Sequence, residues 1–113
     1  MSSPWESFFA ATSILASAGP IKNRLCEAYR VHIAALDEEQ LPKEIREEFS
    51  ALSTRMSLVR PMRGETAIQA TVRKMSDPEA ARQARRIVAM LQTIARVQGQ
   101  QRPKLRAVNS GDD

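Results

Sequence analysis

Cysteine, histidine and aromatic residues are scarce in this sequence. Its 113 residues include one cysteine, Cys26, and one histidine, His32. A single cysteine excludes an internal disulfide and a site built from several thiolates, and a single histidine excludes any site that needs two imidazoles. We therefore predict neither a metal site nor a bound cofactor. A lone cysteine is also typical of a reducing compartment, so we expect a cytoplasmic protein.

Long apolar segments are absent as well. No apolar run approaches the roughly 20 residues that a helix needs to cross a bilayer, so we expect no membrane partner. The run over 8–15 is followed by Ala16-Ser17-Ala18, which resembles the small-residue site that ends a signal peptide. However, Glu6 precedes the run and no lysine or arginine does, whereas a signal peptide begins with positive charge. Secretion is therefore not predicted.

Catalytic motifs are also missing. Four dispersed glycines exclude a glycine-rich phosphate loop, and the sequence contains no Gly-x-Ser-x-Gly, Cys-x-x-Cys or His-Glu-x-x-His motif. Acidic residues cluster at 37–39 and again between 44 and 48. Both clusters lie at predicted helix starts, where the helix dipole favours negative charge. We therefore predict that the protein is not an enzyme.

The sequence is rich in residues that favour helices, including alanine, leucine, arginine, glutamine and glutamate. Its glycines and prolines lie at the edges of segments in which apolar residues recur every three or four positions. This spacing is typical of amphipathic helices. Helices are predicted over residues 4–18, 20–36, 42–59, 65–75 and 78–97.

Several predicted helix ends carry capping residues. Ser3 and Glu6 fit a capping box at the start of the first helix, and Ser76 and Glu79 fit one at the start of the last. Gly19 suits a left-handed position after the first helix, and Gly99 is expected to end the last helix. These residues predict where both helices begin and end.

The chain is expected to form one domain, since 113 residues are too few for two useful cores. Five amphipathic segments joined by short connections can bury their apolar faces only against one another. We therefore predict an all-α fold, a compact bundle of about four to five helices over residues 1–98. A disordered, mobile tail that is polar and basic is predicted over 99–113.

Charge is distributed unevenly along the chain. Residues 1–50 hold five basic and eight acidic side chains, whereas 51–106 hold twelve basic and three acidic ones. Arginine dominates the basic half, and its planar guanidinium suits phosphate or carboxylate partners. Arginines opposite an apolar stripe also keep an amphipathic helix soluble, so charge alone does not identify a ligand.

The leading functional hypothesis is a non-enzymatic interaction or regulatory protein, an adaptor that binds another protein. The first helix is apolar around much of its circumference, which favours contact with a partner. The candidate partner-binding residues are Trp5, Phe8 and Phe9. The same residues are also expected in the core of a domain with so few aromatics, so both roles stay open. A homo-oligomer is compatible with this hypothesis.

The alternative hypothesis is a nucleic-acid-binding protein that contacts phosphates through its last helix and basic tail. The candidate phosphate-binding or acidic-surface-binding residues are Arg73, Lys74, Arg82, Arg85, Arg86 and Arg96. The basic half contains no aromatic side chain on which bases could stack, which weakens this hypothesis.

Overall fold

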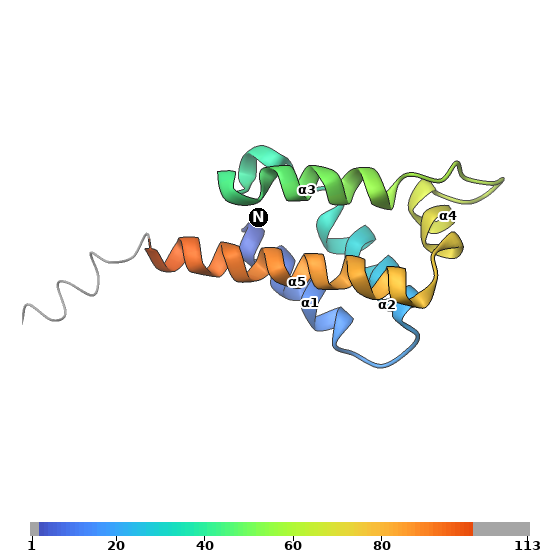
Figure 1. Ribbon diagram of the computed structural model, residues 1–113, viewed down its shortest axis with the longest axis horizontal. Helices are drawn as coiled ribbons and strands as arrows, with labels where there is room; N and C mark the ends of the chain where they lie inside the picture. Colours follow the sequence, from blue (N-terminus) through green and yellow to red (C-terminus); the bar gives the residue numbers. More distant parts are fainter. Residues whose placement is uncertain (1–2, 101–113) are drawn as a thin grey trace, which may run out of the picture.

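Helices make up most of the computed structural model, which describes residues 3–100 (Figure 1). A π-helical segment, η1, directly follows α2, and a 3-10 turn, η2, precedes α3. No β-strand occurs among the described residues, so the predicted all-α fold is confirmed. The elements are α1 (Pro4–Leu15), α2 (Ile21–Ala28), η1 (Tyr29–Ile33), η2 (Glu38–Gln40), α3 (Lys43–Met56), α4 (Ala67–Lys74) and α5 (Asp77–Gln100).

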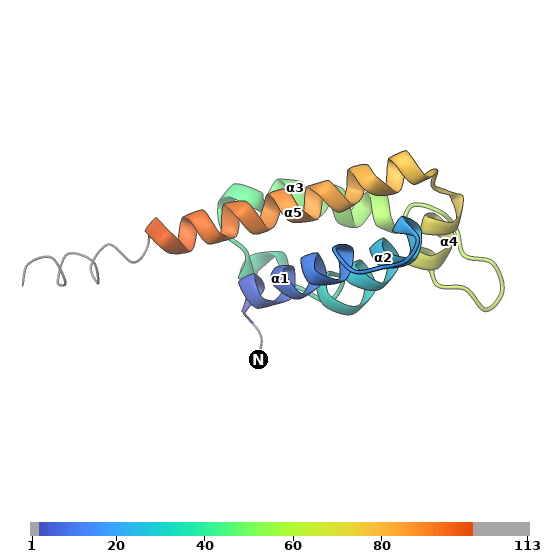
Figure 2. The ribbon, with the colours of Figure 1, turned by 90° about the horizontal axis from the view of Figure 1, so that it is seen from below.

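The long helix α5 organises the bundle. It runs along the molecule and packs against α1 and α2 on one face and α3 on an adjacent face, and α4 lies at one end (Figures 1 and 2). At the opposite end, the last turns of α5 extend past the first residues of α1 and α3 in both views. Other helices therefore cover the end of α5 less than they cover its middle.

The core is built from the predicted apolar stripes. In α3, the stripe Ile45, Phe49, Leu52 and Met56 is at most 5% exposed. This stripe packs against α5. Apolar residues of α5 also recur every three or four positions, so they lie on one buried face of that helix. The largest fully buried apolar side chains from the whole bundle are Phe8, Leu25, Ile33, Leu41, Leu52, Met56, Ile87, Met90 and Ile94.

The predicted capping box at Ser3 and the cap at Ser76 are present, although the Glu79 carboxylate does not return the hydrogen bond that would complete a box at Ser76. The Ser3 hydroxyl accepts the Glu6 amide at 3.2 Å, and the Glu6 carboxylate accepts the Ser3 amide at 3.1 Å. The Ser76 hydroxyl accepts the Glu79 amide at 3.1 Å. Gly19 has a φ of +111°, a left-handed value that favours glycine. These contacts satisfy amides that a helix start leaves unpaired.

The second predicted helix is not a continuous α-helix. It changes at Tyr29, where the Ala34 amide donates to the Tyr29 carbonyl at 2.8 Å, five residues back. This wider turn places both Tyr29 and Ile33 in the core. Side-chain periodicity does not distinguish a single π-turn from an α-turn, so the π-turn was not predictable from the spacing of apolar residues.

Other helix ends also differ from the prediction. The helix α1 ends at Leu15 instead of 18, and α3 ends at Met56 instead of 59. Gly99 does not end α5, because its φ is not positive and the helix continues to Gln100. Residues 99 and 100 are therefore helical, and the rest of the predicted tail, 101–113, lies outside the described residues.

Candidate functional site

The helix α1 places its aromatic residues in two environments. Phe8 is fully buried, so it belongs to the core and does not face a partner. Phe9 is 51% exposed. Trp5 lies one turn earlier and stacks on Phe9, with ring centroids 5.1 Å apart and an interplanar angle of 11°. Of the three predicted residues, Trp5 and Phe9 form an aromatic surface.

A groove lies at the same end of the molecule, where the starts of α1 and α3 meet the end of α5 (Figures 1 and 2). We call it the terminal groove; its volume is about 460 Å³. Buried Leu41 and Ile94 contribute apolar walls. A second hollow of about 340 Å³ shares Gln98 with it and reaches Trp5. The terminal groove is lined by Pro4, Gln40, Leu41, Pro42, Lys43, Glu44, Ile94, Val97 and Gln98.

Half of the six candidate phosphate-binding residues are held in ion pairs. Arg73 Nε lies 2.6 Å from a Glu65 carboxylate oxygen, and Arg86 Nε lies 3.0 Å from one of Glu48. Arg82 pairs with Glu79. These guanidinium groups already have carboxylate partners, which lowers the net positive charge available to a phosphate.

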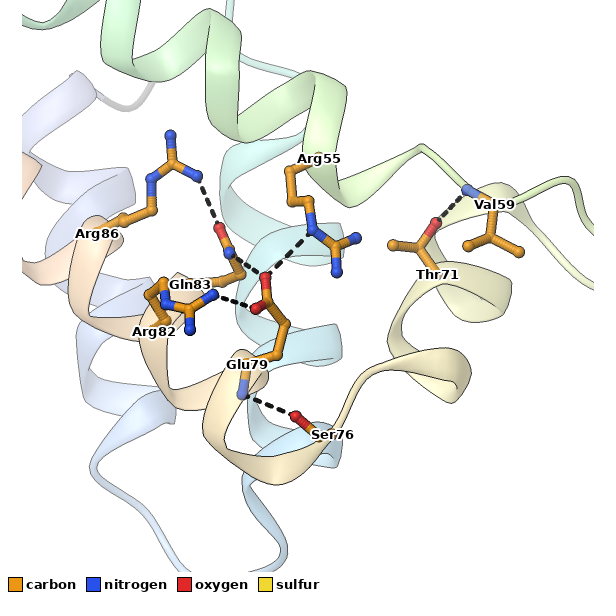
Figure 3. Close-up of polar contacts among 8 residues, drawn as sticks. All are labelled: Arg55, Val59, Thr71, Ser76, Glu79, Arg82, Gln83 and Arg86. Carbon is orange, nitrogen blue, oxygen red and sulfur yellow. Dashed lines mark hydrogen bonds and ion pairs between the residues drawn. The ribbon is translucent and has the colours of Figure 1, made fainter.

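The Glu79 carboxylate is the centre of a polar network that joins α5 to α3 (Figure 3). Its Oε2 accepts from Gln83 Nε2 at 2.7 Å and from Arg55 Nε at 3.2 Å, and Arg82 binds the other oxygen. Gln83 is only 2% exposed and also accepts from Arg86 at 2.9 Å. The hydrogen bond from Gln83, together with the charges of Arg82 and Arg55, lowers the pKa of Glu79 against the opposing effect of desolvation.

The other three candidates, Lys74, Arg85 and Arg96, are exposed and form no ion pair with the described residues. Arg85 and Arg96 are eleven residues apart on α5, which corresponds to about 16 Å along the helix axis. Lys74 is the last residue of a different helix, α4. The structure therefore does not gather the six basic residues into one compact patch.

The connection between α3 and α4, residues 57–66, forms a surface that apolar periodicity did not indicate. Leu58 and Met62 are 64% and 63% exposed, more than any other large apolar side chain described. Arg60 and Arg63 lie beside them and are also exposed. The proline, glycine and arginine of this segment predicted a helix break over residues 60–64, and apolar periodicity placed Leu58 inside the preceding helix.

Contacts at both ends hold this loop in place. The Val59 amide donates to the hydroxyl of fully buried Thr71 at 2.9 Å (Figure 3). The Met62 amide donates to the Glu65 carboxylate at 3.0 Å, and Glu65 pairs with Arg73 on α4. The hydrogen bonds from Arg73 and Met62 lower the pKa of Glu65. Leu58 and Met62 are therefore presented by a loop with defined anchors.

Features of other functional classes are few in the described part of the chain. Residues 3–100 contain no group of three or more His, Cys, Asp or Glu side chains that could hold a metal, and none of their helices is long and apolar enough to cross a membrane. Burial raises the pKa of the Cys26 thiol and outweighs the opposing effect of Arg30, so the reactive thiolate is disfavoured.

The chain matches no family model, curated protein or solved structure. Two exposed surfaces remain as candidates for binding: Trp5 and Phe9 with the terminal groove, and the 57–66 loop.

These surfaces lie at opposite ends of the molecule and differ in charge (Figures 1 and 2). The loop end carries the exposed Arg60 and Arg63. At the other end Glu44 lines the terminal groove, and the exposed Glu38 and Glu39 lie on η2 just before its lining residues, although Lys43 also contributes a positive charge. The acidic residues Glu38, Glu39 and Glu44 thus lie at the opposite end of the molecule from Arg60 and Arg63, and Lys43 and the exposed Arg96 offset part of their charge.

Proposed function

We propose that this protein is a non-enzymatic interaction module, an adaptor that binds another protein through its apolar end. This end consists of Trp5, Phe9 and the terminal groove. The observation that carries the proposal is the half-exposed Phe9 ring stacked on Trp5. A domain with only five aromatic residues gains most by burying them, so a half-exposed Phe9 ring stacked on the partly buried Trp5 favours an interface.

The shape of this end suits a protein partner. Aromatic side chains that fill or flank a pocket contribute much of the binding energy in protein interfaces, and tryptophan is enriched among them. A helix or an extended apolar segment of a partner would cover Phe9 and place apolar side chains against Leu41 and Ile94 in the groove. Binding of this kind depends on buried apolar area and is only weakly sensitive to salt.

Affinity capture with matched variants tests the proposal. Tagged wild-type protein, Phe9→Ala and Val88→Ala are exposed to the same native cell extract at low and high salt. Val88 is the control, because it is 43% exposed on α5 and does not line the apolar end. A protein retained by wild type and Val88→Ala but lost with Phe9→Ala is the expected result. Equal retention by all three proteins would reject this surface.

A direct titration then locates the contact. Trp5 is the only tryptophan, so its fluorescence reports on the aromatic surface. The purified partner should change the emission of Trp5 in wild type and bind Phe9→Ala more weakly. An unchanged emission during saturable binding would place the partner elsewhere.

Nucleic-acid binding is the second candidate function, favoured by the exposed Lys74, Arg85 and Arg96. Phosphate contacts lose orders of magnitude in affinity between about 50 and 200 mM salt. Mixed-sequence DNA and RNA should therefore be titrated at both salt concentrations, with Arg85→Ala as the variant. Binding that collapses at the higher salt and weakens in the variant would favour this function, and no binding at the lower salt would reject it.

A further inference from the structure

We propose that the terminal groove accepts a second copy of this chain, which inserts its 57–66 loop. The exposed Leu58 and Met62 of one copy occupy the groove of the next. This inference rests on the proposed function, because it names an occupant for the same apolar end.

Both the loop and the groove carry exposed apolar atoms. Leu58 and Met62 are each more than 60% exposed, and the only polar contact of the Met62 side chain within the described residues is the hydrogen bond that its Sδ accepts from Arg73 Nη2 at 3.0 Å. The groove has a volume of about 460 Å³ and is lined by the partly exposed Val97 together with Leu41 and Ile94, which are only 2% and 1% exposed. Insertion of the loop therefore removes mainly apolar atoms of Leu58, Met62 and Val97 from water, and burial of apolar surface is the main driving force of protein association.

The loop and the groove also differ in charge. Arg60 lies between the two apolar loop residues and Arg63 follows Met62, and the described part of the chain supplies neither arginine with an ion-pair partner. Glu44 and Lys43 line the groove, and two further carboxylates, Glu38 and Glu39, are exposed on the adjoining turn η2. Opposite charges on facing surfaces steer association and fix orientation. The loop of one copy therefore complements the groove of another in charge as well as in polarity.

The positions of the loop and the groove require two copies of the chain. The loop and the groove lie at opposite ends of the bundle, separated by the length of α3 and α5 (Figures 1 and 2). One copy therefore cannot fill its own groove with its own loop. The contact joins two different surfaces, so it is head-to-tail: it closes into a ring where the rotation between copies permits and otherwise leaves a free loop and a free groove at the two ends. The anchors of the loop at Thr71 and Glu65 limit the conformational entropy lost on docking.

Sedimentation equilibrium of the full chain tests the proposal. The average mass should rise above the 12.6 kDa of one chain as the concentration increases from about 10 μM to about 1 mM, the range expected for a small interface. The loop variant carries Leu58→Ser and Met62→Ser, and the groove variant carries Val97→Arg, which opposes the loop arginines. Each should raise the concentration needed for association at least about tenfold. Val31→Ser is the control, since Val31 is exposed and belongs to neither surface.

Mixing the two variants gives the decisive result. The groove variant keeps an intact loop, and the loop variant keeps an intact groove, so a head-to-tail contact predicts one pair of chains and no further growth. An equimolar mixture should therefore reach twice the mass of one chain at concentrations where each variant alone is a monomer. Circular dichroism of both variants verifies that they are folded.

Three results would overturn the inference: a wild-type monomer at every concentration, association that neither variant weakens, or no pairing in the mixture. None of them affects the proposed function, which is tested by capture of a different protein and by Phe9→Ala. Conversely, loss of the capture result with pairing intact in the mixture would reject the adaptor role and leave the self-association standing.

Discussion

At the scale of single residues, Thr71 and Thr12 each bury a side-chain hydroxyl group, but only the hydroxyl of Thr71 is hydrogen-bonded within the described residues. The Thr71 hydroxyl accepts the Val59 amide at 2.9 Å, and the residue is fully buried. Thr12 Oγ1 is buried and has no hydrogen-bond partner among the described residues. Because burial of an unpaired polar group costs free energy, the hydroxyl should stabilise the fold at position 71 and not at position 12.

This contrast predicts opposite effects of the same substitution. Thr71→Val should lower the free energy of unfolding by about 1–3 kcal/mol, because it leaves the Val59 amide unpaired. Thr12→Val should be neutral or stabilising, because it removes an unpaired hydroxyl and keeps the side-chain shape. Urea unfolding of the two variants measures both effects, and greater destabilisation by Thr12→Val would contradict the assignment.

The aromatic site shows what the sequence could predict at this scale. The cluster Trp5, Phe8 and Phe9 was recognisable from composition alone. Which of two adjacent phenylalanines faces the core was not, because α1 is apolar on several faces and periodicity distinguishes only an apolar face from a polar one. The buried position of Phe8 depends on the packing of other helices around α1.

At the scale of elements, strong periodicity and side-chain caps were reliable guides. The stripe of α3 and the caps at Ser3 and Ser76 were predicted because they depend on residues close in sequence. Gly99 was interpreted wrongly, because glycine permits a left-handed stop without requiring one. The hydrogen bonds that hold the 57–66 loop come from α4, so spacing within the loop did not reveal them.

Alanine substitutions at Gly64 and Gly99 test which of the two positions requires glycine for its backbone conformation. Gly64 has a φ of +80°, whereas Gly99 lies within α5 at an ordinary helical φ, and a Cβ at either position meets no atom within 4 Å. Gly64→Ala should therefore cost about 1–2 kcal/mol through backbone strain alone. Gly99→Ala should be neutral or slightly stabilising, because alanine favours helices. Thermal unfolding compares the two, and equal midpoints would show that φ at 64 carries no strain.

At the scale of the whole molecule, the surplus of arginine is used largely for internal contacts. Arg24 donates to the carbonyls of Leu15 and Gly19 after α1, and Arg46 donates to the carbonyl of Leu41 before α3. Arg55 and Arg86 instead form ion pairs that join α3 and α5. The sequence predicted the total charge of each half, but these pairs require the packing of helices that are far apart along the chain.

The Glu79 network predicts how the stability of the molecule depends on pH. The fold lowers the pKa of Glu79 below its ordinary value of about 4.5, so its ionised form stabilises the folded state. This contribution is fully present above pH 4.5 and is lost as the pH falls through the lowered pKa. Glu79→Gln should therefore be less stable than wild type at neutral pH, and the difference should shrink on acidification.

Urea unfolding midpoints measured from pH 7 to pH 3 test this expectation. Wild type should lose stability more steeply than Glu79→Gln, although the variant keeps some acid sensitivity because the pKa of Glu65 is lowered too. Glu38→Gln is the control, since Glu38 contacts no basic side chain in the described part of the chain, and its curve should run parallel to wild type. A difference between wild type and Glu79→Gln that stays constant with pH would mean that Glu79 acts through its hydrogen bond with Gln83 and not through its charge. The ion pair with Arg55 would then position side chains without stabilising the contact between α3 and α5.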